Sequence, residues 1–315
     1  QLLVSRGVYD ADSARLFLDA KLTGLRDPDL LPGAAAAADR IYAAATDRRK
    51  IVVYGDYDAD GMTGAAILLL CLRQLGADVS YYVPNRLEEG YGLNREALSA
   101  LAERGAQLVI SVDCGIASLA EADHARGLGL ELIITDHHDF AAELPSAAAI
   151  VHPRLPGGAY PFGGLCGAGV AFKLAWAICQ RASNAKRVTD RLRDFLLSAV
   201  GLAAIGTVAD VVPLVDENRI LVRHGLHSLK HMPPLGLAKL IEVVKLHEKK
   251  SLDSEDLAFS LAPRLNAAGR FGQAQLAVEL LTTDSAERAT QIAEYIHALN
   301  SSRDSLERSI QLAAS

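Results

Sequence analysis

The segment from Ile51 to Gly61, IVVYGDYDADG, most constrains how this chain folds and what it binds. A short run of apolar, β-branched residues leads directly into three aspartates at alternating positions, Asp56, Asp58 and Asp60. Crowded carboxylates repel one another, and a divalent cation among them offsets that cost. The run predicts a strand and the following TGAAILLLCLRQLG predicts a helix, so we place the acids on a strand-to-helix turn.

Two other interpretations fit part of the same segment. The three aspartates and Gly61 match the first half of an EF-hand calcium loop, but Ile67 stands where that loop requires a bidentate carboxylate. A strand also precedes the turn, where an EF-hand has a helix, so the calcium loop is excluded. A solvated acidic turn, with Asx-turns and a positive φ at Gly61, stays open as the simpler alternative.

Two later segments repeat the pattern of an apolar run that ends in polar residues. LVISVDCGI places Asp113 after a second run, and ELIITDHHDF places Asp136, His137 and His138 after a third. In an open parallel sheet the carboxyl ends of the strands line one crevice, so these residues can converge in space. Carboxylate and imidazole ligands without a thiolate suit Mn²⁺ or Mg²⁺ better than structural zinc.

A fourth segment, AAIGTVADVVPLVDENR, contains Asp210 between small and β-branched residues. Taken alone, such an acid is more often found at a helix terminus or in a turn than in a metal site. Together with the other acids and the two histidines it calls for a positive counter-ion. Two metal ions bridged by one carboxylate would satisfy this set.

In this order, the motifs DYDADG, VDCG, TDHH and GTVADVVPL resemble those of the DHH phosphoesterase superfamily. Within it the chain is most similar to the RecJ family of bacterial single-strand-specific exonucleases. PNRLEEGYGL, LCGAGVAFKL and LAPRLNAAGR resemble RecJ in particular, and the similarity runs from about residue 50 to the end of the chain. An ordered set of motifs is far more specific than any one of them.

The resemblance implies a role for each acid and histidine. Asp58 and Asp60 would each hold one of two Mn²⁺ or Mg²⁺ ions, Asp113 would bridge the ions, His137 and Asp210 would complete one site, and His138, next to Asp136, would contact the scissile phosphate or assist protonation. Many relatives carry a histidine where this chain has Tyr54, which is a poor ligand for these metals. We therefore expect Asp56 to replace that ligand.

The resemblance also implies substrate contacts. Arg86, Arg264 and Arg270 are the candidates for binding substrate phosphates, with Asn266 as a polar helper. Each arginine could equally cap a helix or pair with a surface acid such as Glu88.

The implied activity is metal-dependent phosphodiester hydrolysis. We expect a 5′-to-3′ exonuclease that degrades single-stranded DNA to 5′-mononucleotides in DNA repair and recombination. Expected partners are single-stranded DNA and repair proteins such as a helicase or a single-strand-binding protein. The alternatives are a DHH hydrolase of short oligonucleotides, cyclic dinucleotides or pyrophosphate, and a non-catalytic RecJ-like replication scaffold. The nearly complete ligand set argues against the scaffold.

Strand and helix patterns alternate along the first half of the chain, which predicts an α/β fold with a doubly wound, mainly parallel sheet. From Leu165 onward the pattern is largely helical. We expect residues 1–200 to form the DHH catalytic domain and residues 201–315 its helical extension, ending in a long connecting helix. The glycine-rich signature of the DHH-associated second domain is absent, so we expect that domain to be missing. GGAYPFGGLCGAGVAF predicts turns and a helix start rather than a nucleotide site.

Composition is typical of a globular protein, and we expect the cytoplasm as its default location. The longest apolar stretches, such as AAILLLCL, are too short to span a bilayer, and no secretory signal is visible. The four cysteines are scattered and form no CxxC pair, which favours reduced cysteines. The net charge of −6 excludes a wholly basic surface, so nucleic acid would have to bind in a local groove.

Overall fold

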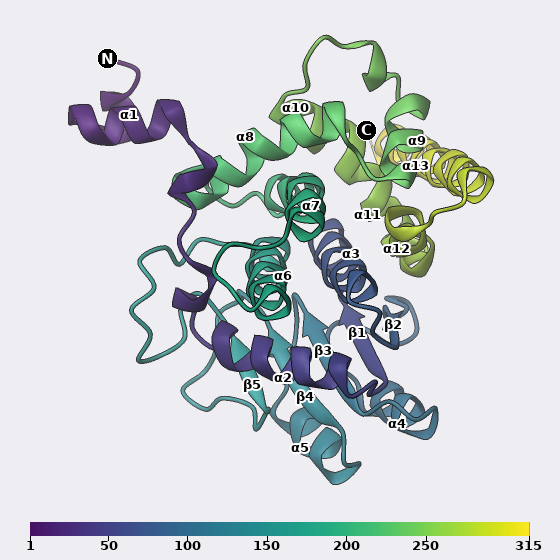
Figure 1. Cartoon of the computed structure of the whole chain (residues 1–315). Coiled ribbons are helices and arrows are strands. Elements are labelled where there is room, and N and C mark those ends of the chain that lie inside the picture. The colour runs from purple at the N-terminus through teal and green to yellow at the C-terminus, as the bar shows by residue number, and fades with distance from the viewer. Residues whose placement is uncertain (315) are drawn as a thin grey trace.

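The computed structural model describes the backbone of residues 1–314, and all of their side chains except those of Arg6 and residues 303–314. Its centre is a sheet of five strands in the order β2-β1-β3-β4-β5 (Figure 1). Every neighbouring pair is parallel. The strands are β1 (Ile51–Gly55), β2 (Val79–Tyr82), β3 (Leu108–Val112), β4 (Glu131–Thr135) and β5 (Ala149–Val151). The predicted α/β fold with a parallel sheet is therefore confirmed.

Helices cover both faces of this sheet. One face packs against α2 (Ala34–Thr46), α3 (Ala59–Gln74) and α6 (Gly167–Ser183), and the other against α4 (Arg95–Glu103) and α5 (Leu119–Gly127) (Figure 1). Alternate residues of β1 divide between these two cores: Val53 belongs to the first and Tyr54 to the second. Because both faces are covered, β1 and β3 are buried at every residue, and their sequences are mainly apolar rather than alternating.

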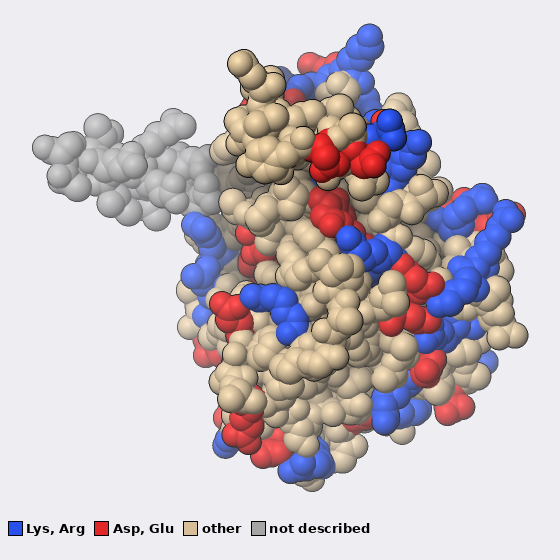
Figure 2. Space-filling model, turned by 90° about the vertical axis from the view of Figure 1, so that its left-hand side faces the viewer, with Lys and Arg blue, Asp and Glu red and all other residues tan. Residues whose placement is uncertain are grey.

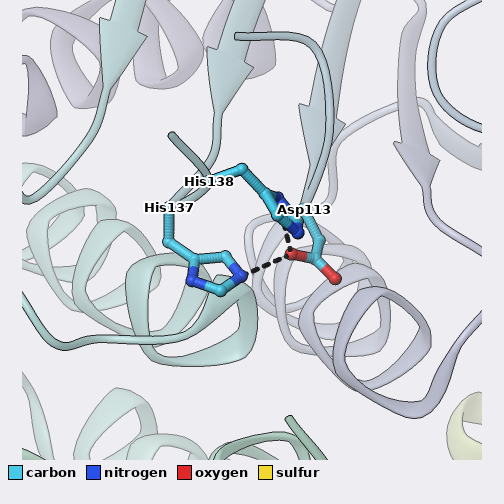
Figure 3. Close-up of side chains that lie close together, drawn as sticks. All are labelled: Asp113, His137 and His138. Carbon is cyan, nitrogen blue, oxygen red and sulfur yellow. Dashed lines mark ion pairs between the residues drawn. The ribbon is translucent and has the colours of Figure 1, made fainter. Parts of the chain in front are cut away.

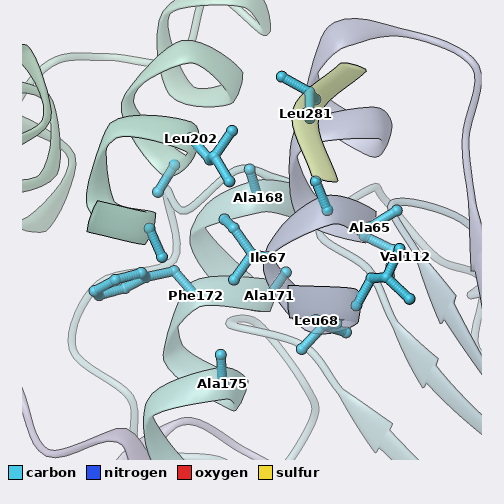
Figure 4. Packing of buried hydrophobic residues seen from close by; sticks show 14 of the residues in the cluster. Ala65, Ile67, Leu68, Val112, Ala168, Ala171, Phe172, Ala175, Leu202 and Leu281 are labelled. Carbon is cyan, nitrogen blue, oxygen red and sulfur yellow. The ribbon is translucent and has the colours of Figure 1, made fainter. Parts of the chain in front are cut away.

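Helix α3 is buried on nearly every side, which explains why its sequence is apolar throughout. It packs closely against α6, which contributes the small residues Ala168, Ala171 and Ala175 to the contact (Figure 4). Small side chains on α6 let the two helices approach closely. The carboxyl end of β1 and the amino ends of α3 and α6 therefore meet in one place.

After α6 the chain is helical, as the sequence predicts. The elements are α7 (Asp190–Ala209), α8 (Asp216–His231), α9 (Leu235–Val243), α10 (Ser254–Asp256), the π-helical turn η5 (Leu257–Leu261), α11 (Ala262–Arg270), α12 (Ala274–Thr282) and α13 (Ala286–Ala314). Before the sheet lie α1 (Ala11–Asp19) and the short 3₁₀ turns η1 (Val4–Arg6), η2 (Leu22–Gly24) and η3 (Pro28–Leu30), and η4 (Leu246–Glu248) follows α9. The long C-terminal helix α13 packs against α9 and α11.

Helix α7 is a core element. It is the one helix in the described part of the chain that is long and apolar enough to cross a membrane, yet 67% of that window is buried inside the protein. It packs against α3, α6 and α8. Its apolar sequence is explained by this internal packing. The four cysteines are also buried and free.

A buried ion pair joins the sheet region to the helical region. Lys173 of α6 and Glu217 of α8 are both fully buried, and the Lys173 Nζ lies 2.8 Å from a Glu217 carboxylate oxygen. The Lys173 ammonium also donates to the carbonyl of Arg26, and the Tyr160 hydroxyl donates to Glu217. Segments far apart in the sequence are thereby fixed next to the start of α8.

Candidate metal centre

The polar ends of three strands meet at the carboxyl edge of the sheet. Asp56 follows β1, Asp113 follows β3, and the Asp136-His137-His138 turn follows β4. The crossovers after β1 and β3 pass to opposite faces, because α3 belongs to one core and α5 to the other. This is the topological switch point of a doubly wound sheet, where ligands bind. The fold therefore brings the motifs close together, as the sequence predicts.

Three groups of residues among the described side chains bring potential ligand atoms within 4.8 Å of one another. They are Asp60, His137 and Asp210; Asp56, Asp58 and Asp113; and Asp113, His137 and His138. Asp113 and His137 each belong to two groups, so the three are parts of one continuous cluster. Figure 3 shows both imidazoles pointing toward the same Asp113 carboxylate oxygen, at 3.1 Å from His137 Nε2 and 3.9 Å from His138 Nδ1.

Buried atoms in this cluster lack hydrogen-bond partners. Asp56 Oδ1, Asp113 Oδ1 and His137 Nε2 are all buried, and none of them makes a hydrogen bond. A buried polar atom without a partner costs on the order of 1–3 kcal/mol, and more when it is charged. Carboxylate oxygens and an imidazole nitrogen are donor atoms that Mn²⁺ accepts. The residues present therefore fit a divalent metal centre.

The pKa shifts also show that the charged form of these acids is unfavourable in their buried surroundings. Burial, followed by the neighbouring Asp58, raises the pKa of Asp56 to about 7 and that of Asp210 to about 6. Burial and the charge of Asp60 raise the pKa of Asp113 well above its usual range. Burial lowers the pKa of His137 to about 4, so this imidazole is neutral near pH 7, the state that binds metals. A cation among the acids would hold them in their charged form.

The amino ends of two helices position the first motif. The Asp58 side chain caps α3 by accepting hydrogen bonds from the backbone N–H groups of Asp60 and Gly61. The Asp60 carboxylate accepts from the first two N–H groups of α6, those of Gly167 at 2.6 Å and Ala168 at 2.8 Å. The glycine-rich stretch is thus a helix start, as predicted, and its amino end stabilises a carboxylate.

Gly167 must be a glycine for steric reasons. A Cβ atom at this position would lie 2.5 Å from Asp113 Oδ1, which is inside van der Waals contact. Asp113 itself has a φ of 65°, a left-handed conformation that is uncommon for residues other than glycine. Strained backbone of this kind is concentrated at functional sites.

Asp136 lies behind the histidines, outside the three ligand groups. Its carboxylate accepts from the backbone N–H groups of Ile116, His137 and His138. It also lies 2.8 Å from His138 Nδ1, and this contact raises the pKa of His138. The structure therefore shows Asp136 orienting His138. The catalytic role expected for the pair stays a prediction.

Tyr54 faces away from the metal ligands. Its ring is fully buried in the core beneath α4, where its hydroxyl donates to the Gly92 carbonyl and accepts from Asn94. Asp56, two residues later, belongs to one of the ligand groups. The expectation that Asp56 supplies the ligand missing at position 54 is consistent with this geometry.

A pocket of about 310 Å³ adjoins the cluster. Its lining residues are Asp56, Tyr57, Asp58, Arg86, Tyr91, Asn266 and Arg270. Sequence reasoning missed the two tyrosines. Tyr91 donates to the Asp113 carbonyl, and GYGL in the RecJ-like segment was the available signal.

The structure does not bring Arg264 to this pocket. Its Nη1 atom donates to the carbonyls of Phe259 and Ser260. Asn266 and Arg270 lie one turn apart on α11 and share a face of the helix. Arg264 is two positions before Asn266 and therefore points to the opposite side. Asn266 also accepts from the Ala59 N–H, which ties α11 to the first motif.

A larger cavity of about 500 Å³ lies elsewhere, between α8 and the segment that leads into α10. Basic residues including Arg223 and Lys230 line it together with His227 and His231, and no carboxylate is among the lining residues in the described part of the chain. In Figure 2, basic and acidic residues are interspersed on the face shown, with wide uncharged areas between them. That face is not uniformly basic, in agreement with the net charge.

Comparison with known proteins identifies the family. Residues 50–200 match the model of the DHH family, N-terminal domain. A crystal structure of exonuclease RecJ bound to manganese aligns with a TM-score of 0.79 and 40% sequence identity, covering 89% of this chain and 68% of that one. The chain belongs to the RecJ family. The resemblance inferred from the motifs is thereby confirmed.

Other RecJ relatives extend beyond the region matched here. RecJ of Bacillus subtilis (strain 168), a single-stranded-DNA-specific exonuclease, is 47% identical over 305 residues, which cover 97% of this chain and 37% of the relative. RecJ of Thermus thermophilus in complex with Mn²⁺ aligns with a TM-score of 0.81 and 36% identity, covering 98% of this chain and 42% of that one. The chain thus spans less than half of the length of these two proteins.

Proposed function

We propose that this chain carries the two-metal centre of a 5′-to-3′ exonuclease that hydrolyses single-stranded DNA to 5′-mononucleotides. The observation that carries the proposal is the position of Asp113, which belongs both to the group with Asp56 and Asp58 and to the group with His137 and His138. A carboxylate shared between neighbouring ligand groups can bridge two adjacent divalent ions. The RecJ relatives whose structures contain Mn²⁺ support the choice of metal.

Two of the three ligand groups would each hold one ion. Asp60, His137 and Asp210 form one group, and Asp56 and Asp58 join Asp113 in the other. Two bound ions would supply Lewis-acid stabilisation of the charge that develops on a phosphate during hydrolysis. His138, which is exposed to solvent and oriented by Asp136, would stand beside the phosphate and supply or hold a proton.

The pocket next to the cluster would receive the substrate. Arg86 and Arg270 line it together with Asn266, and the Arg86 guanidinium lies 5.0 Å above the Tyr57 ring. Arginine binds phosphate through its planar fork, and aromatic rings stack on nucleotide bases. We propose that these residues bind the phosphates of one flexible strand. A duplex would first have to be unstacked to enter.

We also propose the domain division expected from the sequence. The match to the DHH family model ends at residue 200, which supports residues 1–200 as the catalytic domain and residues 201–315 as its helical extension. Helix α7 continues across residue 200 and packs against both regions, so the extension would be part of the same folded unit. Repair proteins such as a helicase or a single-strand-binding protein stay predicted partners, and the cytoplasm the predicted location.

The test is hydrolysis of a 5′-labelled oligonucleotide of about 20 nucleotides, longer than one binding module, in the presence of Mn²⁺. We expect labelled mononucleotide to appear first and blunt duplex to be nearly untouched. Asp113→Ala should reduce turnover by more than about 100-fold, because losing a catalytic metal raises the barrier by several kcal/mol. Faster turnover of pyrophosphate or a cyclic dinucleotide would overturn the substrate, release from the 3′ end would overturn the polarity, and no hydrolysis would favour a scaffold.

A further inference from the structure

Two side chains that follow β5 reach back to the DHH turn. His152 is fully buried, and its Nε2 atom lies 2.9 Å from the backbone carbonyl of His138. Arg154 places its Nη2 atom 2.6 Å from the backbone carbonyl of His137. The carbonyls of both histidines in the cluster are therefore contacted from the end of a neighbouring strand.

The surrounding contacts decide which nitrogen of His152 carries the proton. The backbone N–H of Arg154 donates to His152 Nδ1 at 3.0 Å, so Nδ1 is an acceptor. In the neutral ring the proton is then on Nε2, which donates to the His138 carbonyl. Phe140 packs against the same ring with an edge-to-face geometry and a centroid distance of 4.9 Å. The imidazole is fixed on three sides.

The opposite side of the turn is fixed by Asp136, whose carboxylate accepts from the backbone N–H groups of His137 and His138. The N–H groups of the two histidines are thus held by one carboxylate, while their carbonyls are held by His152 and Arg154. With both polar ends of these backbone units fixed, the direction of each Cα–Cβ bond is set. His137 Nε2, which is buried and makes no hydrogen bond, is thereby aimed at the metal ligands.

We propose that His152 and Arg154 are positioning residues for the metal centre, acting through the backbone carbonyls of His138 and His137. The proposal rests on the metal centre proposed above. Outer contacts that orient a metal ligand typically contribute 10- to 100-fold in metal affinity. A ligand imidazole is useful only if its direction is fixed before the metal arrives, because otherwise binding must also order it.

The experiment measures the Mn²⁺ dissociation constant of the full chain by titration calorimetry, together with the melting temperature of each metal-free variant. His152→Leu removes the donor and keeps an apolar side chain of similar size, whereas His152→Gln can still donate to the His138 carbonyl. The matched control is His224→Leu, because His224 Nε2 lies 2.9 Å from the Ala20 carbonyl, which repeats the same contact away from the cluster. If His152 had only a structural role, His152→Leu would lower the melting temperature and leave the Mn²⁺ dissociation constant unchanged.

We expect His152→Leu to weaken Mn²⁺ binding by about 10- to 100-fold, and His152→Gln and His224→Leu to stay close to wild type. Binding by His152→Leu within twofold of wild type would overturn the role of His152, and so would an equal loss in the glutamine variant. Absence of Mn²⁺ binding by the wild-type chain would instead overturn the metal centre itself, and the positioning role with it.

Arg154→Met keeps the proposal testable if the buried histidine variants do not fold, because the Arg154 side chain is 45% exposed. The loss of a positive charge and the loss of a positioning contact change the Mn²⁺ affinity in opposite directions. Removing a cation near a metal site strengthens cation binding by electrostatics alone, whereas losing the anchor on the His137 carbonyl weakens it. We expect binding weaker by about tenfold. Unchanged or stronger binding would overturn the role of Arg154.

Discussion

The substitution Asp56→Asn tests whether the buried, charged acids of the cluster lower the free energy of unfolding when no metal is bound. Asp56 is 3% exposed, and burial, followed by the charge of Asp58, raises its pKa from 3.8 to about 7. The metal-free folded protein therefore holds a proton at Asp56 that the unfolded chain has released. This contribution to stability is complete below about pH 4 and is lost as the pH rises to 7. Asparagine cannot ionise and has no such dependence.

The size of the effect follows from the two pKa values. A shift of one unit corresponds to about 1.4 kcal/mol, so the full loss for Asp56 is about 4 kcal/mol. Between pH 5 and pH 8 the wild-type protein should lose about 3 kcal/mol of this, because part of the loss has already occurred at pH 5. Relative to wild type, metal-free Asp56→Asn should therefore become more stable by about 3 kcal/mol over that interval.

The assay is urea unfolding of both proteins at pH 5 and pH 8 in the presence of a chelator. Asp78→Asn, at an exposed aspartate, is the matched control. Saturating Mn²⁺ at pH 8 should reverse the order of stability, because wild type gains a ligand that the variant lacks. If the difference between wild type and Asp56→Asn were the same at both pH values, the buried charge would not be the destabilising group.

Three further substitutions test other parts of the structure. Arg270→Ala should weaken binding to single-stranded DNA of any sequence and flatten the slope of log affinity against log salt by about 0.7, measured by fluorescence anisotropy; an unchanged slope would mean that this arginine does not contact phosphate. Lys173→Met should lower the free energy of unfolding in urea by about 3–5 kcal/mol, since it leaves the buried Glu217 carboxylate without its partner, and a loss below about 1 kcal/mol would contradict the role of the pair. Gly269→Ala would place a Cβ atom 1.8 Å from the Tyr57 carbonyl oxygen, so α11 must move away from the first motif. Turnover should then fall about 100-fold, and near-normal turnover would show that this contact is not needed for the centre.

The sequence by itself determined the architecture and which residues would form most of the candidate metal cluster. Each ligand follows directly after an apolar run or lies in a small-residue segment, and this pattern is local. One topological rule, that parallel strands present their carboxyl ends at the same edge, was enough to bring Asp113 and His137 together. The same rule predicted the position of Asp56.

Only the tertiary structure decided which polar side chains contact one another across long sequence separations. Arg264 and Arg270 belong to one motif, but the rotation of α11 about its own axis brings only Arg270 to the pocket. His152 acts on the His138 carbonyl, a contact that no spacing or residue type reveals. Lysine is usually a surface residue, yet Lys173 is fully buried. Local patterns determine which face of a strand or helix is apolar, whereas the pairing of polar atoms depends on how separate elements pack, which is a property of the whole chain.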